Sequence, residues 1–158
     1  MSYHEDIERA HNAAVVAGSR DMRAQADNGT LEVEIESADT LSLAFTSFVF
    51  KTDHLASADA AQLGRIADRL ASKLTYLLEP LRVIEVDGNA GAVQMRSQPP
   101  YQRHKQTRYY EVLVQRGGSL SLVRYERLPG EPRKAIAAHV TEEVFYRLAD
   151  DFAAAATP

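Results

Sequence analysis

The sequence predicts an α+β fold, in which a single curved antiparallel sheet of about six strands has helices packed on one face. Three observations predict it. Segments that alternate apolar and polar residues are typical of strands, amphipathic segments are typical of helices, and turn residues separate them in the order α-β-β-α-β-β-β-β-α. The length of 158 residues suits a single domain spanning 1–158, whose last few residues we expect to fray.

The first helix is predicted from the spacing of Ser2 and Glu5, which is that of a capping box. Its apolar stripe is weak. We therefore expect the helix to end near Gly18 or to continue raggedly to about Ala26.

Two strands are predicted next. The segment "LEVEIES" (31–37) alternates strictly between apolar residues and polar ones, which indicates a strand with one face in water. The segment "LSLAFTSFVF" (41–50) begins with the same alternation and then changes parity. It therefore either contains a bulge near Thr46–Ser47 or is covered on both faces.

The strongest helical pattern covers residues 57–78, with Ser57 as the expected N-cap, and Pro80 ends it. A hairpin is expected over 81–98. The last helix is predicted to begin at Thr141, because two glutamates occupy its first turn.

A second hairpin is predicted where "TRYYEVLVQR" and "SLSLVRYER" flank Gly117–Gly118. A turn centred on the two glycines puts Arg108 opposite Arg127 and Tyr110 opposite Tyr125. In that register both faces of the hairpin carry apolar residues, so both need a cover. Either helices cover both faces or a second copy of the chain covers one, and we favour a homodimer formed through a sheet face.

The predicted pairing of Arg108 with Arg127 has two interpretations. Like charges opposite each other destabilise a sheet, so both side chains extend into water or contact glutamates. Alternatively, they bind a carboxylate or phosphate of a small anionic ligand, as arginine forks do. The candidate anion-binding residues are Arg108, Arg127, Tyr110, Tyr125, Arg103 and Lys105.

The distribution of charge allows two more functions. Net charge is −4, yet residues 96–134 hold 9 basic and 3 acidic groups. Small-molecule or anion binding, in a pocket between the sheet and the 57–78 helix, is the runner-up function. Binding of single-stranded nucleic acid by the 96–134 region is a third alternative, which the sequence pI of about 5.7 disfavours.

No motif predicts catalysis, a metal site or a cofactor. The chain has no cysteine, no Gly-x-Ser-x-Gly segment and no phosphate-binding loop. We therefore expect a non-catalytic domain that acts through protein–protein contact. The sequence shows neither a signal peptide nor an apolar run of roughly 18 residues, which predicts a cytoplasmic protein without a membrane partner.

Overall fold

The computed structural model describes residues 2–157, which form three α-helices, two single-turn 3-10 helices and ten strands. The helices, in chain order, are α1 (Tyr3–Ala17), η1 (Asp53–Leu55), α2 (Ala60–Lys73), η2 (Thr75–Leu77) and α3 (Glu142–Ala155). The strands are β1 (Asp21–Ala26), β2 (Gly29–Ala38), β3 (Ser42–Lys51), β4 (Leu81–Asp87), β5 (Ala92–Ser97), β6 (Tyr101–Arg103), β7 (Gln106–Gln115), β8 (Ser119–Arg127), β9 (Lys134–Ile136) and β10 (Ala138–Thr141).

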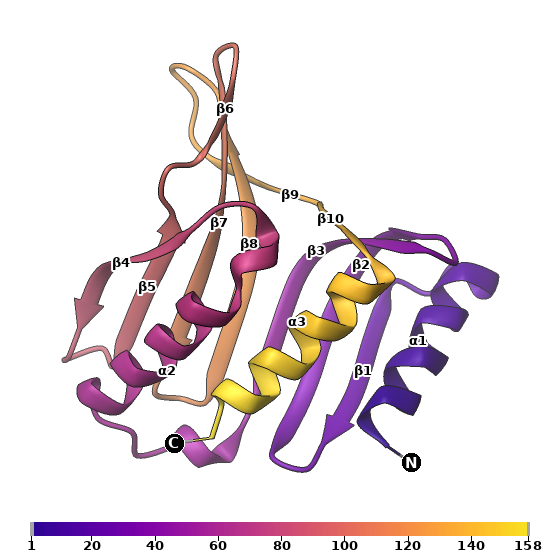
Figure 1. Cartoon of the computed structure of the whole chain (residues 1–158), viewed down its shortest axis with the longest axis horizontal. Coiled ribbons are helices and arrows are strands. Elements are labelled where there is room, and N and C mark those ends of the chain that lie inside the picture. Colours follow the sequence, from indigo (N-terminus) through magenta and orange to yellow (C-terminus); the bar gives the residue numbers. More distant parts are fainter. Residues whose placement is uncertain (1, 158) are drawn as a thin grey trace.

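All strands join one open antiparallel sheet in the order β1-β2-β3-β8-β7-β5-β4, and the short strands β6, β9 and β10 pair with β7, β8 and β3. Helix α1 packs on β1 and β2, α3 on β3, and α2 on β4, β5 and β7, all on the same side of the sheet (Figure 1). The predicted α+β class, with helices packed against an antiparallel sheet, is confirmed. The sheet has more strands than the six expected.

The helix ends follow local capping chemistry. The Ser2 hydroxyl oxygen accepts a hydrogen bond from the Glu5 backbone N–H at 3.1 Å, and Gly18 closes α1 in the left-handed conformation. The ragged continuation to Ala26 is wrong, because residues 21–26 pair with β2 as strand β1.

Helix α2 begins two residues later than predicted, because Asp59 and not Ser57 is its N-cap. Asp59 and Gln62 form a reciprocal capping box, with N···O distances of 2.8 and 2.9 Å. Thr141 caps α3 as predicted, since its hydroxyl oxygen accepts a hydrogen bond from the Val144 N–H.

Of the two alternatives predicted for residues 41–50, strand β3 shows the bulge near Thr46–Ser47. Glu34 pairs with Ser47 and Ile35 pairs with Phe45, so Thr46 has no partner on β2. The extra residue brings side chains of opposite parity to one face. As a result Leu43, Phe45, Phe48 and Phe50 are all buried under the helices.

The register of the β7–β8 hairpin differs by one residue from the predicted register. Its turn is the three-residue segment Arg116–Gly118, so Gln115 pairs with Ser119. Arg108 consequently lies opposite Glu126. The predicted pairing of Arg108 with Arg127 is therefore wrong.

Gly118 explains why the turn has three residues. Its φ of +99° suits only glycine, and a Cβ added there would lie 2.0 Å from the Thr52 carbonyl oxygen. The Gly118 carbonyl oxygen accepts a hydrogen bond from the Thr52 N–H at 2.8 Å. Contact with the β3 end thus fixes the turn, which the Gly-Gly pattern alone leaves open.

The observed register gives the hairpin two different faces. Under the helices lie Val112, Val114, Leu120 and Leu122, all fully buried. On the opposite face, which no helix covers, Leu113 and Val123 are only half-buried among polar neighbours. The prediction that both faces are apolar and need a cover is therefore wrong, because the slip moves every β8 side chain to the other face.

None of the most exposed large apolar residues within 2–157 belongs to the β7–β8 hairpin; they are Val16, Leu41, Leu78, Val83, Ile84, Val86 and Tyr101. At the C-terminal end, α3 continues to Ala155, and Ala155 and Ala156 are buried in the core. Within residues 2–157, no helix combines the length and apolar character needed to cross a membrane.

Candidate ligand-binding pocket

A pocket of about 900 Å³ lies on the helix-bearing face of the sheet, and we call it the helix-side pocket. Strands β7 and β8 extend past the ends of α2 and α3, so no helix covers this part of the sheet (Figure 1). Directly under α2 the space is filled by the fully buried Leu63, Ile66 and Leu70. The pocket therefore lies beyond the end of α2 at Lys73, beside the last two residues of the predicted 57–78 segment, and not between the helix and the sheet.

One wall of the helix-side pocket is apolar. It comprises two leucines and a proline from the α2–β4 connection, two prolines from the β5–β6 connection and the first residue of β6: Leu77, Leu78, Pro80, Pro99, Pro100 and Tyr101. Because each proline ring fixes its φ angle, this wall is stiff without a ligand.

Leu78 stands out within the apolar wall. Its φ is +68°, in the left-handed region that costs a non-glycine residue roughly 1 kcal/mol. Its side chain is also 92% exposed, so burial does not offset this strain. An exposed leucine with a strained backbone beside a pocket is a candidate contact for a bound molecule.

The floor of the pocket holds a buried ion pair. The Arg124 guanidinium donates to the Glu79 carboxylate with an Nη2–Oε2 distance of 3.1 Å, and the two side chains are 13% and 11% exposed. The same guanidinium lies 4.3 Å from the ring centroid of Tyr110. Burial raises the pKa of the Tyr110 hydroxyl above its ordinary value.

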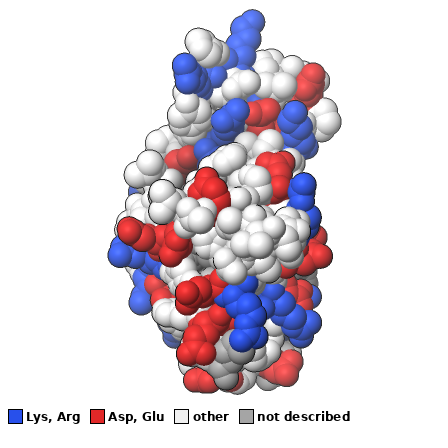
Figure 2. All heavy atoms as spheres, turned by 90° about the vertical axis from the view of Figure 1, so that its right-hand side faces the viewer, with Lys and Arg blue, Asp and Glu red and all other residues white. Residues whose placement is uncertain are grey.

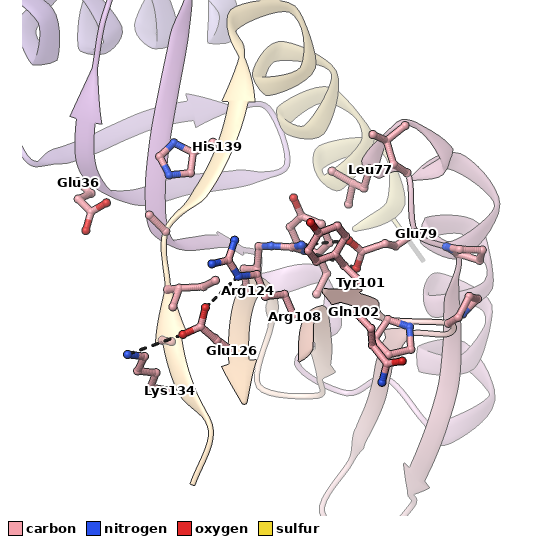
Figure 3. A pocket seen from close by; sticks show the side chains of 18 residues that line it. Glu36, Leu77, Glu79, Tyr101, Gln102, Arg108, Arg124, Glu126, Lys134 and His139 are labelled. Atoms are coloured by element: carbon pink, nitrogen blue, oxygen red, sulfur yellow. Dashed lines mark hydrogen bonds and ion pairs between the residues drawn. The ribbon is translucent and has the colours of Figure 1, made fainter. Parts of the chain in front are cut away.

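A second ionic group lies beside it and joins three neighbouring strands. Glu126 of β8 is almost fully buried and contacts Arg108 of β7, with an Nε–Oε2 distance of 2.9 Å, and Lys134 of β9, with an Nζ–Oε1 distance of 3.8 Å (Figure 3). The register places these three residues opposite one another. Arg108 therefore already has Glu126 as its ion-pair partner, whereas the predicted anion site requires an Arg108 side chain without a carboxylate partner.

The pocket as a whole has no excess charge. Its lining contains three glutamates, Glu36, Glu79 and Glu126, and three basic side chains, Arg108, Arg124 and Lys134. His139 also lines it, across from the apolar wall (Figure 3). Because the charges cancel, the pocket does not select for a strongly charged ligand.

The structure separates the six candidate anion-binding residues. Arg108 and Tyr110 line the helix-side pocket, whereas Arg127 and Lys105 line a smaller hollow on the open face. Tyr125 lies on the open face beneath the Arg133 guanidinium, 3.9 Å from its ring centroid. The exposed Arg103 ends strand β6 and lines neither hollow.

Two side chains that line the pocket were not predicted from the sequence. Glu79 lies in a turn outside any periodic pattern, and its pairing with Arg124 joins residues 45 positions apart. Leu78 was predicted to be the last residue of the 57–78 helix. The sequence does indicate that Leu78 lies at the point where the helix ends, because Pro80 forces the chain out of the helix just after Leu78.

The structure provides no metal centre among residues 2–157, since no cluster of three or more His, Asp or Glu side chains occurs there. No protein-family model matches the chain, and comparison with curated proteins and with solved structures also finds no match.

Proposed function

We propose that this protein binds a small amphipathic molecule of no net charge in the helix-side pocket. The observation that supports the proposal best is the pairing of a stiff apolar wall with a floor of mutually neutralised charges in one hollow. Its volume of about 900 Å³ lies within the range of small-molecule sites.

The polar side of the pocket provides hydrogen-bond donors that can orient such a ligand. Of the three guanidinium nitrogens of Arg108, only Nε donates a hydrogen bond to an acceptor within residues 2–157. The two terminal nitrogens can therefore donate to a ligand oxygen. The apolar part of the ligand then lies against Leu77, Leu78 and the prolines.

Titration with Nile red, a neutral amphipathic dye, tests the proposal. Saturable fluorescence enhancement is expected under native conditions. The variant Leu78→Gly should weaken dye binding about three- to tenfold, because it removes an apolar contact worth on the order of 1 kcal/mol. The same variant should retain or gain stability, since glycine tolerates the left-handed conformation.

Leu41→Gly is the matched control, because Leu41 is also strongly exposed, at 75%, and lies away from the pocket. Its dye binding should equal that of the unchanged protein. Absence of saturable binding, or equal loss in both variants, would contradict the ligand-binding proposal.

Self-association stays a prediction, and the edge strand β4 is the surface that favours it. Val83, Ile84 and Val86 are exposed there, whereas the open sheet face carries no comparable residue. A bulge at Ile84 brings Val83 and Val86 to the same face. We propose a second copy of the chain as the occupant of this edge.

A two-fold antiparallel pairing of β4 with itself is complementary. It can place Val83 opposite Val86 and Arg82 opposite Asp87, with each pair on one face of the joined sheet. Light scattering after size exclusion should then report a dimer, and Val83→Lys with Val86→Lys should give a monomer. A monomeric unchanged protein at about 100 μM would exclude this contact, given the affinities typical of specific dimers.

A further inference from the structure

A second hollow, of about 430 Å³, opens on the side of the sheet that no helix covers. It lies between the β6–β7 hairpin and the β8–β9 loop, which both protrude from one end of the molecule (Figure 1). Lys and Arg side chains stand out at this end in the side view (Figure 2). We call it the open-face hollow.

The charge of the open-face hollow is one-sided. Arg96, Lys105 and Arg127 line it, and no carboxylate does. The side chains of Lys105 and Arg127 form no hydrogen bond or ion pair with any other residue in 2–157. These two cations therefore lack the glutamate partners that Arg108 and Arg124 have on the other face.

Arg96 at the base of the hollow is also incompletely satisfied. Its Nη2 lies 3.6 Å from the Glu111 carboxylate, which in addition accepts hydrogen bonds from Arg133 and Gln94. Its Nε is buried and has no hydrogen-bond acceptor within the described chain. A buried donor without a partner is costly, and an anion nearby reduces the cost of the concentrated positive charge.

The aromatic residues beside the hollow do not offer a stacking surface for bases. Arg96 covers Tyr109 at 4.7 Å from its ring centroid, and Arg133 covers Tyr125 at 3.9 Å. Tyr109 is nearly fully buried as well. Recognition of single-stranded nucleic acid normally uses exposed aromatic faces, so these contacts disfavour it.

We infer that the open-face hollow binds a phosphate-type oxyanion, with Arg127 and Lys105 as its principal ligands. A guanidinium fork and an ammonium group together suit a tetrahedral oxyanion, and Gln102 and Thr107 line the same hollow as neutral donors. The open-face hollow shares Pro100 and Gln102 with the lining of the helix-side pocket but differs from it in charge, in its principal ligands Arg127 and Lys105, and in the expected ligand, so each proposal can fail without the other.

Titration with inorganic phosphate at low ionic strength, followed by amide NMR, tests the inference. Saturable shifts are expected at residues of the hollow, including Thr107 and Gly130. Arg127→Gln should weaken phosphate binding at least tenfold, and the double variant with Lys105→Gln should abolish it. Both side chains are exposed and unpaired, so the variants should fold normally.

Arg103→Gln is the matched control, because it removes an exposed positive charge from the β6–β7 hairpin, which also carries Lys105, and Arg103 does not line the hollow. Its phosphate affinity should stay within about twofold, which is the general effect of one screened charge. Equal weakening by Arg103→Gln and Arg127→Gln, or identical shifts with chloride, would overturn the inference.

Adenosine monophosphate and a ten-nucleotide single strand distinguish the sources of the phosphate group. Equal affinity for the mononucleotide and inorganic phosphate supports recognition of the phosphate alone. Tight binding of the single strand that persists in Arg127→Gln would instead favour a nucleic-acid surface and contradict the site.

Discussion

The two hollows flanking strand β6 contain similar residue types but differ in charge. In the helix-side pocket, Glu79 and Glu126 neutralise Arg124 and Arg108. On the open face, Glu111 is shared by Arg96 and Arg133, and no acidic side chain within residues 2–157 pairs with Arg127 or Lys105. The connection after α2 supplies Glu79 to the helix side.

This difference shows that the hairpin register sets the chemistry of both faces. Strand alternation sorts Arg108, Arg124 and Glu126 to the helix side and Arg127 to the open side. A slip by one residue on β8 would return Arg127 to the face of Arg108 and remove Glu126 from it. Changes at the turn are therefore expected to have the largest effect.

Gly118→Ala should have the largest effect, because Gly118 fixes the register that makes the two faces of the hairpin different. The added Cβ clashes with the Thr52 carbonyl oxygen and needs a φ near +99°, so the free energy of unfolding should fall by about 2 to 4 kcal/mol. Urea denaturation measures this. Gly117→Ala is the control, since a Cβ there meets no atom within 4 Å, and it should cost less than about 1 kcal/mol. Similar losses in both variants would show that the turn does not fix the register.

Glu79→Gln should have the next largest effect. It leaves the buried Arg124 without its charge partner, so we expect a loss of about 2 to 3 kcal/mol in the free energy of unfolding. Glu32→Gln on the open face is the control: its partner Lys51 is solvent-exposed, and the loss should stay below about 1 kcal/mol. Equal losses of stability in the two variants would contradict the idea that the buried ion pair on the helix side matters more than the exposed pair on the open face.

The smallest expected effect is on how the free energy of unfolding depends on pH in the alkaline range. Burial raises the folded-state pKa of Tyr110 above its unfolded value, so its contribution to stability is complete below about pH 10 and is lost as pH rises further. Burial raises the pKa values of Tyr3, Tyr76 and Tyr146 in the same direction. Tyr110→Phe should therefore reduce the loss of stability between about pH 10 and 12. An unchanged slope of unfolding free energy against pH would contradict the role of burial at Tyr110.

The fold class was predictable because it rests on local patterns. The Ser2 and Thr141 caps, the alternation over 31–37 and the change of parity near Thr46 all depend on neighbouring residues, and each agrees with the structure. Strand β1 was missed because its alanines fit a helix as well as a strand. Strands β6, β9 and β10 have only three or four residues each, too few to show periodicity.

The candidate site was only partly predictable. The basic, aromatic hairpin was recognised, and four of its six candidate residues line one hollow or the other. The register of the hairpin was predicted wrongly, because a double glycine permits both a two-residue and a three-residue turn. The partners Glu79 and Lys134 come from distant connections, so no local pattern indicates them.

The sequence by itself determined the helices, most of the strands and the concentration of positive charge in the second half of the chain, because propensity, periodicity and charge are properties of neighbouring residues. Only the tertiary structure decided which basic side chains form ion pairs with which glutamates. Close packing of Gly118 against the Thr52 carbonyl selects one register. That register gives glutamate partners to the arginines on one face of the sheet and leaves two cations on the other face unpaired.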